Sequence, residues 1–406
     1  MDAAVSVNCC AVKLGNQISL VNYKLKRMAS IKLAAFAVAA SSFAQLVPSD
    51  PAGAGMSATQ LEAASKILAE ETASGRVLAA SLIVTRREKV VLHRGYGKLA
   101  PAGDAKPVKP GTVFLLASIT KPVTACSLML LVERGKVSVN DLAHVYLPEL
   151  AHKEIRVRDL LSHTSGMPDM LPENTQLRRA NAPLSEFVKH ALTTKLLYPP
   201  GTDFRYQSMG TLLAGEIVER VSGMRLRDFE QKEIFGPLGM KDSSLGMGGR
   251  RIEDTAWCQT NPGPDTDRFG ANSPYWRDMG HPWGGMHSTT MDLAILLQTF
   301  LNGGVYNGRR VFSKATTAAM TRNQNTALPN RGWGFGWGLA TSPVWSYFGE
   351  LASPRTFGHS GATGTVAWAD PETGLVCVIL TTRPSGEDNG GLLRRVSNAV
   401  AAAVQE

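Results

Sequence analysis

The chain has 406 residues, of which 44% are hydrophobic and 19% charged, and its formal net charge is +9 at pH 7. A chain of this size buries roughly three-quarters of its unfolded surface and can form one large domain or two interleaved ones. Residues 1–44 contribute +4 of the charge, and the other basic residues are scattered and not interleaved with aromatic ones, which argues against a nucleic-acid partner.

Residues 1–44 have the pattern of a signal peptide. Basic residues between 24 and 32 precede the apolar run 33–40, and Ser42-Phe43-Ala44 offers a small-x-small cleavage site. The apolar run is too short for a permanent membrane anchor. Because the basic segment lies far from Met1, Met28 is a second candidate start. We expect an exported protein, periplasmic or secreted; a cytoplasmic enzyme with an amphipathic leader is the alternative.

The secondary structure expected after a linker at 45–56 is β-rich at both ends and helical between. A capping box at Ser57 and Gln60 begins a first helix that Gly75 ends. Runs at 80–84 and 90–93, split by charged residues 86–89, predict a hairpin, and runs at 365–369 and 375–381 predict a second. Helical patterns lie at 118–134, 157–162, 185–193, 209–222, 226–234 and 392–404.

This order predicts an α/β fold of the α+β type. The simplest arrangement joins both hairpins in one antiparallel sheet that is flanked by the terminal helices. A helical lobe, roughly 112–290, would be inserted into a sheet lobe made of 57–111 and 291–406, so that 57–406 form one domain. A cleft between the lobes would hold the site, with segments 172–197 and 246–282 as its walls.

Ser118-Ile119-Thr120-Lys121 is the most informative stretch of the chain. A serine three residues before a lysine at the start of a buried helix places the hydroxyl and the amine on one face. The free N–H groups of the helix start favour negative charge on the reacting oxygen. Serine needs such help to act as a nucleophile. Since this spacing is common by chance and serine often only caps a helix, the motif needs support from others.

Two later motifs supply that support. Tyr206-Gln207-Ser208 precedes a helix near Met209, and a cationic lysine near Tyr206 would lower the pKa of its phenol toward a useful value; a half-buried packing role is the alternative. Gly358-His359-Ser360-Gly361-Ala362 leads into the last hairpin. Ser360 in a G-x-S-x-G elbow would need a later histidine, and none follows His359. The other interpretation is a strand that lines the cleft, with His359 and Ser360 facing the substrate.

Other features of the sequence predict no further chemistry. Cys126, Cys258 and Cys377 have no metal or disulfide pattern and are expected to be buried small residues. His281 and His287 lie six apart without carboxylates, so we expect no metal and no cofactor. The glycine-rich stretch 332–338 lacks a following Gly-Lys-Ser/Thr, so its Trp333 and Trp337 either shape an acyl pocket or only pack.

The order of these motifs resembles the serine β-lactamases of class C, the low-molecular-weight penicillin-binding proteins and, closest, the family VIII carboxylesterases. The resemblance covers roughly residues 58–404 and includes three further stretches, Val157 to Gly166, Pro237 to Met240 and Gly284 to Ser288. It implies a β-lactamase/transpeptidase-like fold and acyl transfer through a covalent acyl-enzyme.

By position, the resemblance implies that Ser118 is the acylated nucleophile and Lys121 its proton acceptor or electrostatic partner. Tyr206 would be a base for serine or water, and which of the two bases dominates stays open. The oxyanion hole would be the N–H groups of Ser118 and Ala362. The residues expected around the substrate are His359, Ser360, Gly361 and Ser208.

Two departures from the family pattern decide the expected substrate. Many members carry Y-x-N and a K-T-G that begins with lysine, whereas this chain has Ser208 and His359. Histidine is largely neutral at pH 7 and attracts a β-lactam or peptide carboxylate poorly. We therefore expect an esterase of short or medium acyl esters with weak β-lactam hydrolysis. The alternatives are a D-alanyl-D-alanine carboxypeptidase or D-amino-acid amidase, a β-lactamase, and, from another class, a penicillin-binding-like sensor without turnover.

The expected partner is a small-molecule ester or amide. The intact set of Ser118, Lys121 and Tyr206 argues against the sensor. The sequence does not determine the natural substrate, the acyl chain length or the oligomeric state.

Overall fold

A computed structural model describes residues 45–259, 266–342, 344 and 347–405 of the chain. The predicted signal peptide at 1–44, with its candidate starts Met1 and Met28, lies outside the described residues. Within them, no helix is both long and apolar enough to cross a membrane.

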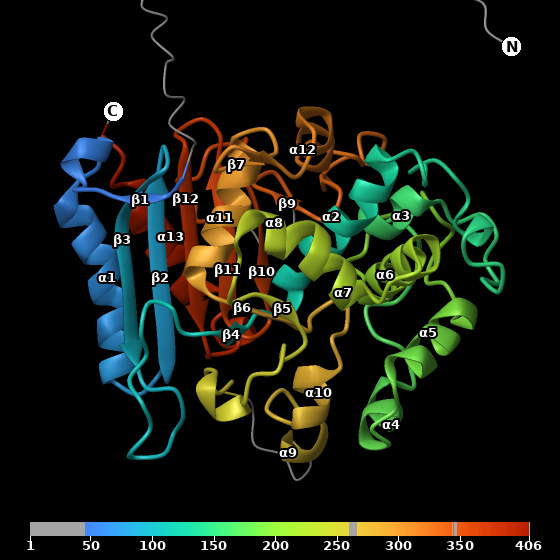
Figure 1. The fold of residues 1–406 in the computed structure, drawn as a ribbon, viewed down its shortest axis with the longest axis horizontal. Helices are drawn as coiled ribbons and strands as arrows, with labels where there is room; N and C mark the ends of the chain where they lie inside the picture. Colours follow the sequence, from blue (N-terminus) through green and yellow to red (C-terminus); the bar gives the residue numbers. More distant parts are fainter. Residues whose placement is uncertain (1–44, 260–265, 343, 345–346, 406) are drawn as a thin grey trace, which may run out of the picture. The chain divides into compact units, whose positions relative to one another are not determined.

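In the described part of the chain, the main sheet has seven strands in the order β1-β3-β2-β12-β11-β10-β9. Neighbouring strands are antiparallel except β1 and β3. The N-terminal and C-terminal hairpins meet where β2 pairs with β12, with Val84 opposite Cys377. The prediction that both hairpins share one antiparallel sheet is therefore confirmed (Figure 1). The strands are β1 (Val47–Pro48), β2 (Ala79–Arg86), β3 (Lys89–Gly97), β9 (Gly338–Leu339), β10 (Phe357–Gly361), β11 (Thr365–Asp370) and β12 (Leu375–Thr381).

Both predicted hairpin turns are present. Arg87 and Glu88 have φ angles of 47° and 69°, which is the two-residue turn that matches the twist of adjacent strands. In the second hairpin, the Asp370 carboxylate accepts from the Glu372 N–H and from the Thr373 hydroxyl, both at 2.9 Å. Strands β2, β3 and β11 extend beyond the predicted apolar runs, because backbone pairing continues after the apolar pattern ends, whereas β12 coincides with its predicted run.

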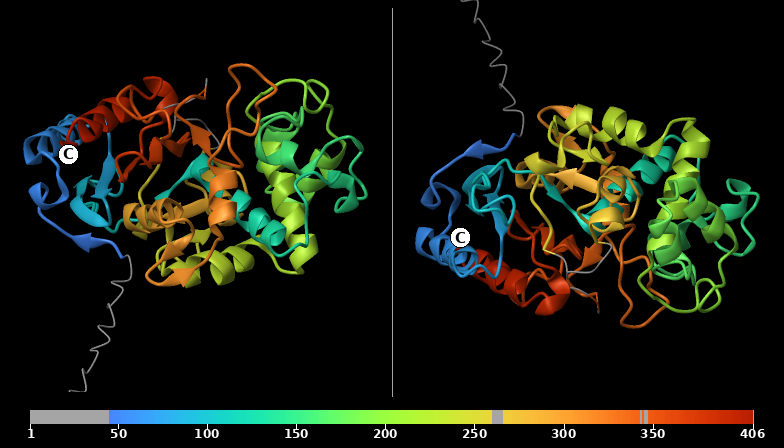
Figure 2. Two further views of the ribbon diagram at one scale, coloured as in Figure 1. Left: turned by 90° about the horizontal axis from the view of Figure 1, so that it is seen from above. Right: turned by 90° about the horizontal axis from the view of Figure 1, so that it is seen from below.

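The sheet separates two hydrophobic cores because successive strand residues point to opposite faces. Leu82, Val84 and Cys377 pack with helices α1 (Ala58–Ala73) and α13 (Gly391–Ala401). Ile83 and Val378 belong to the other core, which includes α11 (Thr290–Leu301). Figure 2 shows α1 and α13 side by side on one face, so the sheet is flanked by helices as expected.

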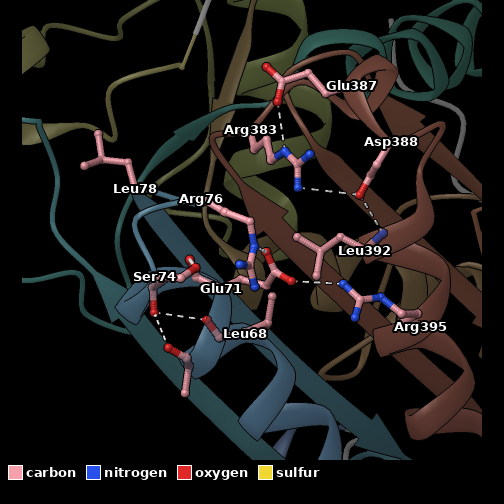
Figure 3. Close-up of polar contacts among 12 residues, drawn as sticks. Leu68, Glu71, Ser74, Arg76, Leu78, Arg383, Glu387, Asp388, Leu392 and Arg395 are labelled. Atoms are coloured by element: carbon pink, nitrogen blue, oxygen red, sulfur yellow. Dashed lines mark hydrogen bonds and ion pairs between the residues drawn. The ribbon is translucent and has the colours of Figure 1, made fainter.

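The terminal helices begin close to their predicted positions. The Ser57 hydroxyl caps α1 by accepting from the Gln60 N–H at 3.3 Å. A buried carboxylate, Glu71, joins this helix to α13, since it accepts from Arg76 Nε at 2.7 Å and from Arg395 Nη2 at 3.0 Å (Figure 3). The last helix ends at Ala401, three residues earlier than predicted.

Residues 45–56, expected to be a linker, are packed onto the sheet. Val47 and Pro48 form β1 beside β3, Leu46 and Ala54 are buried, and Met56 forms a β-bridge with Val404. The apolar residues in this segment are too few and irregular to predict a strand.

The middle of the chain is helical as expected, and α2 packs against α6. The helices expected from the sequence are α2 (Thr120–Glu133), α3 (Val157–Leu161), α5 (Leu184–Thr193), α6 (Ser208–Ser222) and α7 (Leu226–Glu230). The last of these continues through a wider turn, Gln231–Phe235, into α8 (Gly236–Leu238).

Several short elements were not predicted. A second sheet has the order β4-β6-β5, and β7 pairs with β8. These elements are α4 (Asn174–Arg179), α9 (Thr266–Phe269), α10 (Pro274–Asp278), α12 (Lys314–Met320), β4 (Phe114–Leu115), β5 (Ser244–Leu245), β6 (Met286–Ser288), β7 (Val305–Tyr306) and β8 (Arg309–Arg310). Short 3-10 turns lie at Ala52–Ala54, Ala117–Ile119, Ala143–Val145, Ile252–Asp254 and Ser385–Glu387.

Candidate active site

Ser118 lies in the 3-10 turn Ala117–Ile119, directly before α2. Ala117 has a φ of 50°, in the left-handed region that costs an L-residue roughly 1–2 kcal/mol. The turn is held by Thr120, whose hydroxyl donates to the Ala117 carbonyl at 2.7 Å and accepts from the Met286 N–H at 3.0 Å. Such strain persists where the surrounding structure fixes it, and it concentrates at functional sites. Ser118 thus precedes the regular helix, whose first residue is Thr120.

Lys121 is buried beside this serine. Its Nζ donates to Ser118 Oγ at 3.0 Å and to the Trp283 carbonyl at 3.0 Å, and the residue is only 2% exposed. Burial lowers the pKa of Lys121 from 10.5 to about 7, although the Asp169 carboxylate acts in the opposite direction. A large fraction of the side chain is therefore neutral near pH 7 and can accept a proton.

Tyr206 completes the group around Ser118. Its hydroxyl hydrogen-bonds with Ser118, and its ring centroid lies 4.6 Å from Lys121 Nζ. The expectation that the lysine lowers the pKa of this phenol is wrong. Burial raises the pKa of Tyr206 well above its usual value, and this effect exceeds that of the hydrogen bond with Ser118. Tyr206 therefore stays a phenol at neutral pH, able to donate or relay a proton, and Lys121 is the better base.

The stretch 157–166 positions Tyr206. His163 has a φ of 62°; its carbonyl accepts from the Arg205 N–H at 3.1 Å and its Nδ1 accepts from the Gln207 N–H at 3.2 Å. The His163 and Tyr206 rings lie 4.6 Å apart between centroids. Ser165 donates to Gln207 Oε1 at 2.6 Å. The backbone on both sides of Tyr206 is thus anchored to this stretch, which the sequence marks only through its family resemblance.

Strand β10 brings its C-terminal end against the turn that carries Ser118. The hydroxyls of Thr363 and Thr365 donate to the carbonyls of Leu115 and Leu116, each at 2.9 Å. A Cβ at Gly361 would lie 2.1 Å from the Leu116 carbonyl oxygen, so only glycine permits this approach.

Histidine at position 359 carries no charge at neutral pH. Burial, followed by the positive charge of Lys121, lowers the pKa of His359 from 6.5 to about 3. Its Nδ1 lies 2.6 Å from the Ser360 carbonyl, which can only accept, so the proton is on Nδ1. Position 359 on β10, which is a lysine in many members of the family that the sequence resembles, is therefore uncharged in this protein.

Ser208 contacts a residue that the sequence did not indicate. Its hydroxyl donates to Asp169 Oδ1 at 2.6 Å, and Ser208 is only 1% exposed. The exposed Asp169 carboxylate acts electrostatically on both Lys121 and Tyr206. No spacing rule points to Asp169, because a loop residue 39 positions from Ser208 is brought close only by folding.

Two cavities meet at Ser118. The larger, about 420 Å³, is mostly apolar, and both Ser118 and Ala362 line it. The segments 172–197 and 246–282, expected to form walls, supply Arg178, Trp276 and His281 to it. The smaller, about 220 Å³, is lined by Ser118, Tyr206, Tyr347, Ser360, Gly361, Ala362, Ser385 and Gly386. Neither His359 nor Ser208, both expected around the substrate, is among the lining residues of these two cavities.

The two tryptophans of the glycine-rich stretch have different places. The Trp333 ring lies 6.1 Å from that of Tyr206 and 5.6 Å from that of His359, whereas Trp337 packs against Phe300 and Phe357. Neither tryptophan lines the two cavities at Ser118, so both serve packing.

The three described cysteines, His281 and His287 are buried. Cys126, Cys258 and Cys377 are free thiols, as expected. His281 lies between Trp276 and Trp283, with ring distances of 4.1 and 4.7 Å. Across the residues that the structure describes, no group of three or more His, Cys, Asp or Glu side chains could hold a metal ion.

Comparison with known proteins identifies the family. The model of the Beta-lactamase family matches residues 64–401, which is most of the chain. The chain belongs to the β-lactamase family. Its fold is that of a superfamily of serine hydrolases, which confirms the fold and the family expected from the sequence.

One curated relative and two solved structures of the same fold are similar to this chain. A protein of Salmonella enteritidis PT4 named "Putative D-alanyl-D-alanine carboxypeptidase" is 30% identical, over 75% of this chain and 78% of the relative. A penicillin-binding protein homologue from Caulobacter crescentus is 24% identical with a TM-score of 0.69, over 85% of this chain and 99% of its own. A family VIII carboxylesterase is 22% identical with a TM-score of 0.68, over 85% of this chain and 99% of its own.

Proposed function

We propose that the protein is a serine carboxylesterase that cleaves short or medium acyl esters through an acyl-enzyme on Ser118. The observation that carries the proposal is the 3.0 Å contact between Lys121 Nζ and Ser118 Oγ, at the junction of two cavities. The pKa of Lys121, lowered to about 7, makes this lysine a base at neutral pH.

In the first half of the reaction, neutral Lys121 takes the proton of Ser118 as Oγ attacks the ester carbonyl. The oxyanion is bound by the N–H groups of Ser118 and Ala362, and each such donor is worth about 2.7–4 kcal/mol of transition-state stabilisation. Tyr206 gives its phenol proton to the leaving oxygen and regains one from Lys121, so the C–O bond breaks and the alcohol departs.

In the second half, water attacks the acyl-enzyme with neutral Lys121 as the base, and the proton returns to Ser118 Oγ as the acid leaves. The raised pKa of Tyr206 supports a relay role for this residue, because its phenol is protonated at the start of each half.

The smaller cavity favours an uncharged leaving group. Tyr206 lines this cavity and not the larger one, so the leaving oxygen has to face it. Its described lining contains no lysine or arginine, and His359 nearby is neutral with a pKa lowered to about 3. Arg383, on the segment before Ser385, already pairs with Glu387 at 2.8 Å (Figure 3). A leaving group that carries a carboxylate, as in a peptide that ends in D-alanine, finds no lysine or arginine among the described lining residues.

The second candidate is a D-alanyl-D-alanine carboxypeptidase or amidase with the same Ser118 acyl-enzyme. It is favoured by the name of the Salmonella relative at 30% identity. Export, which we also propose from the pattern of residues 1–44, would place either enzyme outside the cytoplasm with a small ester or amide as its partner.

The test compares the purified protein with its Ser118→Ala variant on p-nitrophenyl butyrate, nitrocefin and a D-alanyl-D-alanine peptide, with adducts followed by mass spectrometry. Ester turnover that depends on Ser118 and exceeds the other two is the expected result. Dominant peptide or nitrocefin turnover would transfer the protein to the peptidase or β-lactamase branch. Stoichiometric labelling without turnover would support the sensor, and equal rates for both proteins would remove Ser118 as the nucleophile.

A further inference from the structure

Arg178 is the one lysine or arginine among the described lining residues of the larger cavity. It lies at the end of α4, half-buried, with its guanidinium carbon 3.7 Å from the centroid of the Trp276 ring. Its Nε and Nη2 both donate to the Phe269 carbonyl, at 3.2 and 2.7 Å. These contacts fix the plane of the guanidinium at the cavity wall, where Trp276 is also a lining residue.

The charge of Arg178 has no counter-ion in the described part of the protein. The described contacts of its guanidinium are with the Phe269 carbonyl and the Trp276 ring, neither of which carries a negative charge. Burial lowers the pKa of this guanidinium, which nevertheless stays charged at neutral pH. An anion bound in the cavity would pair with this partly buried cation and offset the cost of its burial.

The larger cavity is on the acyl side of the scissile bond. Tyr206 faces the smaller cavity, and a proton donor must lie beside the leaving oxygen. The acyl chain therefore extends in the other direction from Ser118. Leu115, Met170 and Trp283 give that cavity the apolar surface that a methylene chain requires, and Arg178 is its charged element.

We propose that Arg178 is a specificity-determining residue that binds a carboxylate at the far end of the acyl chain. The preferred substrates are then monoesters of dicarboxylic acids, in which the methylenes lie along the apolar wall and the free carboxylate accepts from the guanidinium. This inference rests on the proposed function, since it names the acyl group that Ser118 receives.

The test uses matched pairs of p-nitrophenyl esters. Monoesters of glutarate, adipate and suberate carry a free carboxylate, and the same compounds capped as methyl esters are uncharged and of nearly equal size. The measured quantity is the ratio of kcat/KM for the free acid to that for the methyl ester, after the rate with Ser118→Ala is subtracted. A charge-assisted hydrogen bond is worth about 1.5–3 kcal/mol, or roughly ten- to a hundredfold in this ratio.

The expected result is a ratio above ten for at least one chain length, which falls about tenfold or more in Arg178→Gln. Arg178→Lys is expected to keep part of the ratio. Arg179→Gln is the matched control, because it removes the same charge from the same helix at an exposed residue that does not line the cavity.

The outcomes separate the two proposals. The first outcome is turnover of the methyl esters that depends on Ser118, with a wild-type ratio of kcat/KM (free acid to methyl ester) at or below one for all chain lengths. This outcome would overturn the role of Arg178 and leave the esterase proposal standing, and it requires no variant of Arg178. A high ratio that persists in Arg178→Gln, or that Arg179→Gln abolishes equally, would also overturn it. No Ser118-dependent turnover of either ester would overturn both proposals.

Discussion

Replacement of Lys121 by methionine gives the sharpest test of the proposed base, because activity and stability should change in opposite directions. Methionine fills a similar volume without a charge, so it removes the proton acceptor. We expect kcat/KM on p-nitrophenyl butyrate to fall by roughly 10²–10⁴-fold, the range for a general base. In the wild type, kcat/KM should rise with pH with an apparent pKa near 7, since only neutral Lys121 accepts the proton.

The effect on stability follows from the same pKa. The fall from 10.5 to about 7 on folding corresponds to about 5 kcal/mol of lost stability at and below pH 7. Methionine removes this cost but also the hydrogen bonds to Ser118 and Trp283, each worth roughly 0.5–1.5 kcal/mol. The variant should therefore be about 2–4 kcal/mol more stable than the wild type at pH 7.

This advantage should shrink as the pH rises. Between about pH 7 and 10.5 the unfolded chain binds a proton at Lys121 that the folded protein does not, so wild-type stability increases by about 1.4 kcal/mol per pH unit. Urea unfolding at pH 7, 8 and 9 measures the change. Lys66→Met, at a side chain that is 72% exposed, controls for removal of a lysine. A variant that is less stable than the wild type by the same amount at all three pH values would refute the reasoning.

Three further predictions concern other parts of the structure. Tyr206→Phe should lower kcat/KM by roughly 10²-fold or more while the acid limb stays near pH 7; a loss below threefold would exclude Tyr206 as the relay. Gly361→Ala should lower the free energy of unfolding by about 1–3 kcal/mol and abolish acylation, because its Cβ would lie 2.1 Å from the Leu116 carbonyl; unchanged urea unfolding would contradict this contact. Glu71→Gln should cost about 1 kcal/mol at pH 7 through its two arginines. Because folding lowers the pKa of Glu71 below its ordinary value of 4.5, this difference should shrink as the pH falls below that value, and a difference in urea unfolding that is as large at pH 3 as at pH 7 would argue against the ion pairs.

The local features of the fold could be predicted from the sequence because they depend on neighbours along the chain. Turn residues and strand runs marked both hairpins, the Ser57 hydroxyl marked the start of α1, and apolar spacing marked α2 and α6. The shared sheet followed from the order of these elements. Short elements such as α4 and β6 escaped prediction because a few residues carry no measurable periodicity.

For the candidate site, the sequence by itself determined which residue types stand at 118, 121 and 206. The spacing of three residues between Ser118 and Lys121, at the start of one helix, placed these two side chains beside each other. Only the tertiary structure decided the protonation of Lys121 and Tyr206, because burial depends on segments far apart in sequence. Burial lowers the pKa of Lys121, and it raises the pKa of Tyr206, which the sequence analysis expected to be lowered. The tertiary structure also decided that Arg178 faces the cavity at Ser118, since 60 residues of chain separate the two and no local rule spans that distance.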